Sequence, residues 1–217
     1  MVSLDELMVI SFIVGFSGAA SPGPLLVVVI RDTLSGTWRD GTAAILAHGL
    51  LEGIIITSIV AGLSAVTITS PLANGIATIG GSILIGFGLL TLKGIRGTQS
   101  ASDPVKIHPQ NILHSFKDGV VATVSNGYWY VWWFSAGLTI VTRALPFGIA
   151  GMSLTGFAHW LSDLTYYSLI IILLSLGRGF FKPQTYSLLL IGCSGFMAVF
   201  GAFFIYLGLA GQMPVTL

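Results

Sequence analysis

Ser21-Pro22-Gly23-Pro24 interrupts the apolar segment 7–30 near its middle. Each proline lacks a backbone amide donor and clashes with the carbonyl group four residues earlier, so an α-helix has to kink or unwind here. Leu25 would then start a second half-helix, whose free N-terminal amides favour an anion such as a carboxylate. The stretch therefore predicts a helix that is broken at its centre.

The composition predicts that this helix lies in a membrane. Hydrophobic residues make up 54% of the 217 residues and charged residues only 8%, whereas a soluble domain carries about 25% charged residues. The mean hydropathy is +0.92. A net charge of +1 without a Lys/Arg cluster excludes a surface for nucleic acid. The single Cys193 excludes an intrachain disulfide and a thiolate metal site, and we expect no cofactor.

Six apolar segments are long enough to cross a lipid bilayer, which takes about 20 helical residues. One polar linker, residues 98–111, divides the chain into a first half of residues 1–97 and a second half of residues 112–217. We therefore predict an all-α, multi-pass integral membrane protein with six transmembrane helices in two three-helix repeats. The segments are 7–30, 41–66, 73–93, 116–140, 147–176 and 184–210.

The positively charged residues indicate the orientation. Of the nine Lys and Arg residues, eight lie on one side of the predicted membrane, and only Arg143 lies on the side that holds both termini. By the positive-inside rule, the linker is cytoplasmic and both termini lie outside the cytoplasm, as in a protein of the inner cell membrane. The eight residues are Arg31, Arg39, Lys93, Arg96, Lys106, Lys117, Arg178 and Lys182.

The two halves show a weak internal similarity. Residues 15–23 read GFSGAASPG, residues 119–127 read GVVATVSNG, and the two stretches share Gly, Ser and Gly at one constant offset. Three spans precede the second half, so it enters the membrane from the opposite side and the repeat is inverted. Ser125-Asn126-Gly127 would break the fourth span as Ser21 to Pro24 break the first.

Paired breaks in corresponding spans point to the binding site of a transporter, because freed backbone groups at membrane depth have to face protein or a wet cavity. The aromatic run 128–134 forms either an interfacial belt or a cavity wall that binds a cation or an apolar side chain. The predicted substrate-binding residues are Ser21, Pro22, Gly23, Pro24 and Asn126 at the breaks, and Tyr128 and Trp129 on the second interpretation of the aromatic run.

Each half also carries a histidine followed four residues later by a carboxylate, His48 with Glu52 and His159 with Asp163. Residues at this spacing share one face of a helix. Ionisable side chains inside a membrane are costly, at about 2.5–3.5 kcal/mol each on insertion scales, and they mark ion pathways and proton relays. We therefore expect all four residues to take part in proton coupling.

The first span and the following loop resemble a known family. Ser21-Pro22-Gly23-Pro24, followed by the loop 31–41 with the sequence RDTLSGTWRDG, resembles the N-terminal signature of the LysE/RhtB-type amino-acid exporters. The resemblance implies export of amino acids or related metabolites from the cytoplasm by the proton-motive force. Many members have Asn-Pro-Lys in the fourth span, where this chain has Asn126-Gly127-Tyr128. Because the lysine is missing, the resemblance does not indicate which substrate this chain transports.

These observations favour an amino-acid exporter that works by proton antiport. The broken helices would hold the substrate carboxylate, Glu52 or Asp163 would hold its ammonium group, and a proton would compete for the same acids. A divalent transition-metal exporter remains the alternative, since His48, Glu52, His159 and Asp163 could together coordinate Zn or Mn. An intramembrane enzyme has less support, because the zinc-protease motif His-Glu-x-x-His is absent. The Gly-rich spans are compatible with a homodimer.

Overall fold

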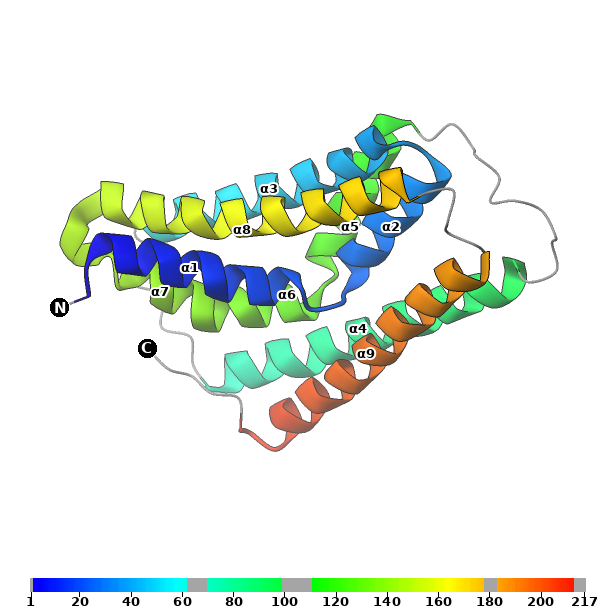
Figure 1. Cartoon of the computed structure of the whole chain (residues 1–217). Helices are drawn as coiled ribbons and strands as arrows, with labels where there is room; N and C mark the ends of the chain where they lie inside the picture. The colour runs from blue at the N-terminus through cyan, green and yellow to red at the C-terminus, as the bar shows by residue number, and fades with distance from the viewer. Residues whose placement is uncertain (1, 62–69, 99–110, 178–182, 213–217) are drawn as a thin grey trace.

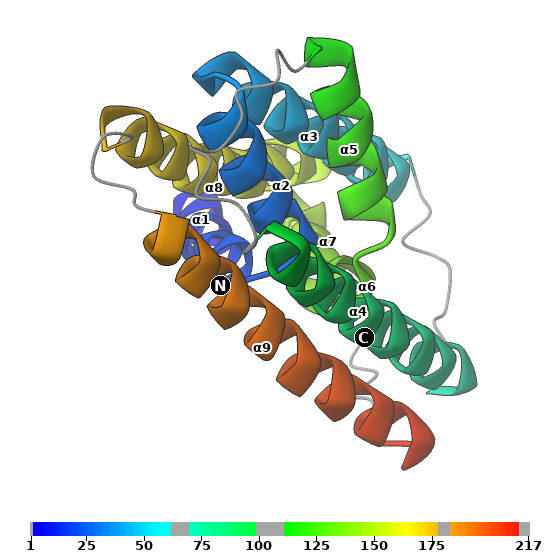
Figure 2. The same ribbon diagram turned by 90° about the vertical axis from the view of Figure 1, so that its right-hand side faces the viewer.

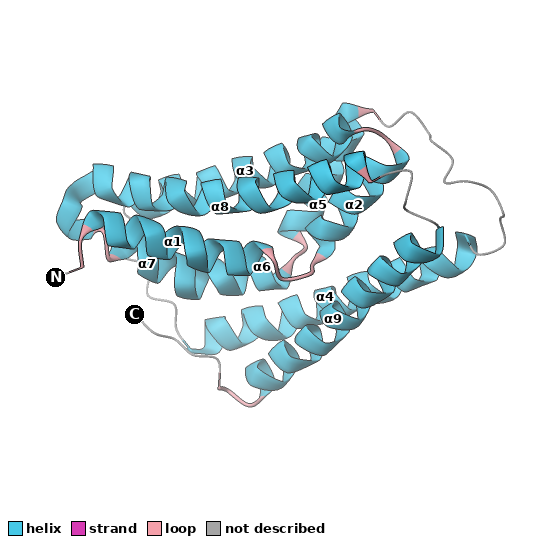
Figure 3. Cartoon of the chain, in the orientation of Figure 1, coloured by secondary structure: helices cyan, strands magenta, loops and turns pink. Residues whose placement is uncertain are grey.

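The structure is a computed structural model of the chain, and it describes residues 2–61, 70–98, 111–177 and 183–212. Every regular element within these ranges is a helix (Figure 3). The all-α prediction is therefore confirmed for the described part of the chain. Most of the expected linker, residues 99–110, lies outside it.

The first expected span consists of two helices. Helix α1, Leu4–Ala19, begins at a capping box in which Ser3 and Glu6 bond to each other's backbone amides. Helix α2, Pro24–Ser35, starts with Pro24 in the first turn, where a missing amide donor has no cost. The two helices are bent by 72° relative to each other. The break predicted at Ser21 to Pro24 is confirmed.

The fourth expected span, 116–140, is also divided. It comprises α5, Ile112–Val124, then α6, Gly127–Trp132, a π-helical turn η2, Trp133–Gly137, and α7, Leu138–Thr142. The side chain of Asn126 accepts a hydrogen bond from the amide of Tyr128 at 3.1 Å, and so caps α6. A side chain that bonds to the backbone in this way competes with helix continuation, which explains the break at Ser125-Asn126.

Four described helices are long and apolar enough to cross a membrane, and the bent pair α1 and α2 brings the number to five. The break predicted at Ser125-Asn126-Gly127 divides segment 116–140, and none of its pieces has membrane length by itself. The membrane-length helices are α3, Trp38–Val60, α4, Ser70–Thr98, α8, Gly148–Leu176, which follows the short turn η3, Leu145–Phe147, and α9, Pro183–Leu209.

Helices α3 and α8 pack side by side in the larger bundle, with α1 against α8 and α5 against α3 (Figures 1 and 2). Helix α4 packs mainly along α9, and the two form a separate pair on one side of the bundle. The pair meets the bundle through α6, where Gly80 and Gly127 touch: a Cβ on Gly80 would lie only 2.5 Å from the Cα of Gly127.

The outer surface of the helix pair is apolar. Leu90 on α4 and Leu188, Val199 and Leu209 on α9 are each more than two-thirds exposed. Large apolar side chains in this number are what a lipid-facing surface requires, since hydrocarbon accepts no polar groups. The protein therefore presents the exterior of a multi-pass membrane protein.

Candidate functional site

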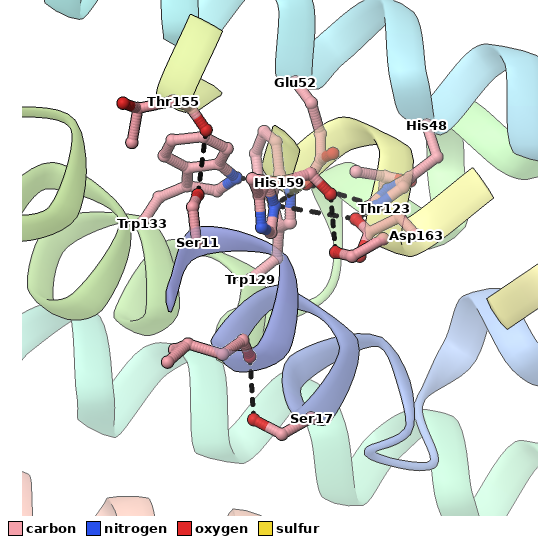
Figure 4. Close-up of polar contacts among 12 residues, drawn as sticks. Ser11, Ser17, His48, Glu52, Thr123, Trp129, Trp133, Thr155, His159 and Asp163 are labelled. Atoms are coloured by element: carbon pink, nitrogen blue, oxygen red, sulfur yellow. Dashed lines mark hydrogen bonds and ion pairs between the residues drawn. The ribbon is translucent and has the colours of Figure 1, made fainter. Parts of the chain in front are cut away.

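The two His/carboxylate pairs meet between α3 and α8 (Figure 4). His48 Nε2 lies 3.2 Å from Asp163 Oδ2 and 3.4 Å from Glu52 Oε1. His159 Nε2 lies 3.1 Å from Glu52 Oε1 and 3.6 Å from Asp163 Oδ2. Each histidine is therefore closer to the carboxylate of the other helix than to the one on its own helix, and the four side chains form one cluster.

The cluster is buried, and none of its members is more than 7% exposed. Buried ionisable groups are tolerated where they are paired and hydrogen-bonded. Each of these groups has a partner across the α3–α8 contact, which the sequence alone did not establish.

Glycines bring the neighbouring helices close to this cluster. A Cβ on Gly15 of α1 would lie 2.5 Å from His159 Nδ1. A Cβ on Gly119 of α5 would lie 2.5 Å from the carbonyl oxygen of Ala44 on α3. Both contacts require a residue without a side chain. These glycines therefore determine how closely α1 and α5 approach the His/carboxylate pairs on α8 and α3.

The approach of α5 brings a further polar group to the cluster. Thr123 Oγ1 lies 3.0 Å from His48 Nδ1, and Thr123 is buried. This arrangement fits the tautomer in which the Thr123 hydroxyl donates to Nδ1 and the proton on Nε2 faces Asp163.

The aromatic run 128–134 contributes side chains to the His/carboxylate cluster, in addition to any interfacial belt. The indole nitrogens of Trp129 and Trp133 donate to Glu52 Oε1 at 3.4 and 3.2 Å. The ring of Trp132 stacks on His159, with the ring centroids 4.1 Å apart. All three tryptophans are buried. Because the α6–η2 segment turns these indoles inward, the geometry favours the cavity-wall interpretation of the run.

Two polar atoms of the cluster have no hydrogen-bond partner among the described residues, Glu52 Oε2 and His159 Nδ1. A buried polar atom without a partner costs about 1–3 kcal/mol. Such atoms at the centre of a cluster are places where a ligand, a proton or water can gain a hydrogen bond.

A cavity connects the cluster with both helix breaks. The space open to the centre of a water-sized molecule is about 40 Å³, which is room for a few waters. A larger ligand therefore requires the helices to move apart. The lining residues are Gly18, Ala19, Ser21, Gly23, Leu25, His48, Glu52, Thr123, Asn126, Tyr128, Trp129, Trp132, His159, Asp163 and Tyr167.

Most residues expected to bind substrate line this cavity, namely Ser21, Gly23, Asn126, Tyr128 and Trp129. Pro22 lines a smaller neighbouring cavity with Phe196 and Phe200, and Pro24 is buried in the first turn of α2.

Sequence reasoning missed Thr123, Trp133 and Tyr167 as members of the site. Thr123 lies within the stretch that matches the first half, and Tyr167 follows Asp163 at the same four-residue spacing that identified the pairs. Either pattern could have drawn attention to these positions.

The cluster could also hold a cation. One ligand atom each from His48, Glu52 and Asp163 lies within 4.8 Å of the others. Imidazole and carboxylate ligands in this number suit divalent transition metals.

Comparison with known proteins identifies the family. Neither the curated proteins nor the solved structures contain a match to the chain. The family model described as LysE type translocator matches residues 16–208. This range contains both helix breaks and all four residues of the His/carboxylate cluster. The chain therefore belongs to the LysE type translocator family, which makes it a membrane transporter for small molecules rather than an enzyme.

Proposed function

We propose that the protein exports amino acids or related small metabolites from the cytoplasm by proton antiport. The observation that carries this proposal is the buried cluster of His48, Glu52, His159 and Asp163 in a cavity between two broken helices. A cavity at paired helix breaks is typical of the substrate site of a secondary transporter. Intramembrane His/carboxylate groups are typical of proton relays.

An amino acid can be accommodated by opposite sides of this cavity. Leu25 lies in the first turn of α2, whose amides can donate to a carboxylate, and the Asn126 side chain has amide protons beside them. Glu52 or Asp163 accepts from the substrate ammonium group. Tyr128 and Trp129 cover the apolar part of the substrate.

The packing supports alternating access by two inverted halves, residues 1–97 and 112–217. Helix α1 packs on α8 in the way that α5 packs on α3. Two of the six crossings are then broken spans, α1 with α2 and α5 with α6 to α7. Rocking of one half against the other would expose the cavity to each side in turn.

The ends of the helices support the proposed orientation in the inner cell membrane. Arg31, Arg39 and Lys117 lie toward the ends of α2, α3 and α5 that are opposite the start of α1 (Figure 1). Arg143 directly follows α7, which lies beside α1 (Figure 1). The positive end is cytoplasmic and both termini face outward.

Efflux from proteoliposomes tests this function. Vesicles loaded with an amino-acid mixture are followed by mass spectrometry, with and without an imposed pH gradient. We expect gradient-dependent loss of one class of amino acid, which Glu52→Gln abolishes and Asp5→Asn retains, since Asp5 is an exposed carboxylate on α1. Equal efflux from vesicles that contain the wild-type protein and from loaded vesicles without protein would contradict the proposal.

A divalent transition-metal exporter is the second candidate, because the ligand atoms of His48, Glu52 and Asp163 lie within 4.8 Å of one another. Titration calorimetry of the purified protein with Zn²⁺ and Mn²⁺ separates the two candidates. Metal binding that His48→Ala abolishes, together with no amino-acid efflux, would favour the metal exporter.

A further inference from the structure

The two halves do not supply the same side chains to the cluster. At the constant offset that relates Gly15 to Gly119, Thr123 corresponds to Ala19, Trp129 to Leu25 and Trp133 to Val29. Ala19, Leu25 and Val29 are buried apolar residues. The hydrogen-bond donors that surround Glu52 and His48 therefore have no counterparts around Asp163 and His159.

Glu52 is held by two indole donors at one oxygen. Its Oε1 atom accepts from Trp133 at 3.2 Å and from Trp129 at 3.4 Å, and it lies 3.1 Å from His159 Nε2. Hydrogen bonds to an ionised carboxylate are about twice as strong as those to a neutral one. The two indole donors on one oxygen therefore favour the ionised form of Glu52.

Asp163 has fewer donors. Its Oδ2 atom lies 3.2 Å from His48 Nε2. Its Oδ1 atom has a long contact of 3.5 Å to the Ser162 hydroxyl, which already donates to the His159 carbonyl at 2.6 Å. Two carboxylates that share one site repel each other when both are ionised. The carboxylate with fewer donors relieves this repulsion by taking the proton.

We propose that Asp163 is the carboxylate that gains and releases the transported proton, whereas Glu52 stays ionised and binds the cationic group of the substrate. The inference rests on the proposed antiport and assigns different tasks to two residues that the sequence treats as equivalents. Glu52 Oε2 has no partner among the described residues and is the atom that the substrate ammonium group would reach.

No lysine or arginine lines the cavity as described, so a cation entering it meets no fixed positive charge. The titratable groups that face Asp163 are His48 and Glu52 from α3, His159 and Tyr167 from α8, and Tyr128 from α6. In the empty site, a proton on Asp163 relieves the repulsion between the two acids. A substrate ammonium group at Glu52 relieves it in the same way while Asp163 is ionised, so proton and substrate occupy the site in turn and move in opposite directions.

Two transport measurements on the same proteoliposomes test the assignment. The first is efflux driven by a pH gradient, and the second is exchange of labelled for unlabelled substrate at equal pH on both sides. We expect Asp163→Asn to lose the gradient-driven efflux by about 10-fold or more, while its exchange persists and no longer varies with pH. Glu52→Gln should lose both activities.

Trp133→Phe provides a second test that keeps both carboxylates. The variant removes one donor from Glu52 Oε1 and keeps a smaller aromatic ring at this buried position. We expect the exchange assay to show a weaker substrate affinity and an altered pH profile. Phe134→Leu serves as the control, because the Phe134 ring is exposed and makes no bond to Glu52. A Trp133→Phe pH profile equal to that of the wild type would overturn the role given to the indole donors.

The outcomes separate this inference from the function on which it rests. Wild-type protein that shows no gradient-driven efflux overturns antiport and the inference together. If the wild type shows gradient-driven efflux, two results overturn the inference alone. One is pH-dependent exchange in Asp163→Asn, and the other is full exchange in Glu52→Gln. If Asp163→Asn fails to fold, Asp163→Glu replaces it and should restore gradient-driven efflux with a shifted pH profile.

Discussion

Thr123 Oγ1 of α5 lies 3.0 Å from Nδ1 of His48 on α3. The contact joins residues from the two halves of the chain and fixes which imidazole nitrogen faces Asp163. An equivalent bond is absent at His159, since Nδ1 of that ring has no hydrogen-bond partner within the described ranges.

Replacing Thr123 by valine should therefore destabilise the protein. The substitution keeps the shape of the side chain but leaves His48 Nδ1 without its partner, at a cost of about 1–3 kcal/mol. Thermal unfolding in detergent measures the change, and Thr57→Val is the control because its exposed hydroxyl bonds only to the carbonyl of Gly53. Equal melting temperatures for the two variants would contradict the prediction.

Gly15→Ala should push α1 away from α8. The added Cβ would lie 2.5 Å from His159 Nδ1, and overpacking of this kind costs about 1–3 kcal/mol. We expect lower thermal stability and slower efflux. The matched control is Gly53→Ala on α3, where an added Cβ has no atom within 4 Å. The control should be at least as stable as the wild type, because Ala has the higher helix propensity. A Gly15→Ala variant as stable as this control would contradict the prediction.

Gly80→Ala should loosen the pair α4 and α9 from the broken span. Its Cβ would lie 2.5 Å from Gly127 Cα, which is backbone and cannot rotate away. Cysteines placed on α4 and α6 would report a reduced cross-linking rate in this variant. Gly86→Ala, on the same helix with nothing within 4 Å of the new Cβ, should cross-link as the wild type does.

Arg31→Ala should cost more stability than Asp118→Ala. Arg31 Nε bonds to Oδ1 of the fully buried Asp32 at 2.6 Å, and its guanidinium also pairs with the partly exposed Asp118. Removing Arg31 leaves a buried carboxylate without its cation, which costs about 3–5 kcal/mol, whereas an exposed pair contributes about 0–1 kcal/mol. Thermal unfolding of both variants, with Arg39→Ala as a surface control, measures the difference. A larger loss in Asp118→Ala would show that the link between α2 and α5 matters more than the burial of Asp32.

Much of the architecture could be predicted because it depends on local sequence. The breaks at Pro22 to Pro24 and at Asn126 follow from missing amide donors and from side-chain capping, which act within a few residues. The π-helical turn that follows Trp132 was not predicted, because hydropathy does not report such a local change in helical winding.

By itself the sequence determined that the chain lies in a membrane, that two of its spans are interrupted, and that His48 and Glu52, like His159 and Asp163, share one face of a helix. Helical periodicity and hydropathy are sufficient for these conclusions. Only the tertiary structure decided that the two faces meet, that each histidine lies nearer the opposite carboxylate, and that Trp133 donates to Glu52. The rotation and separation of packed helices depend on distant contacts such as Gly15 on His159, and periodicity along one helix carries no information about them.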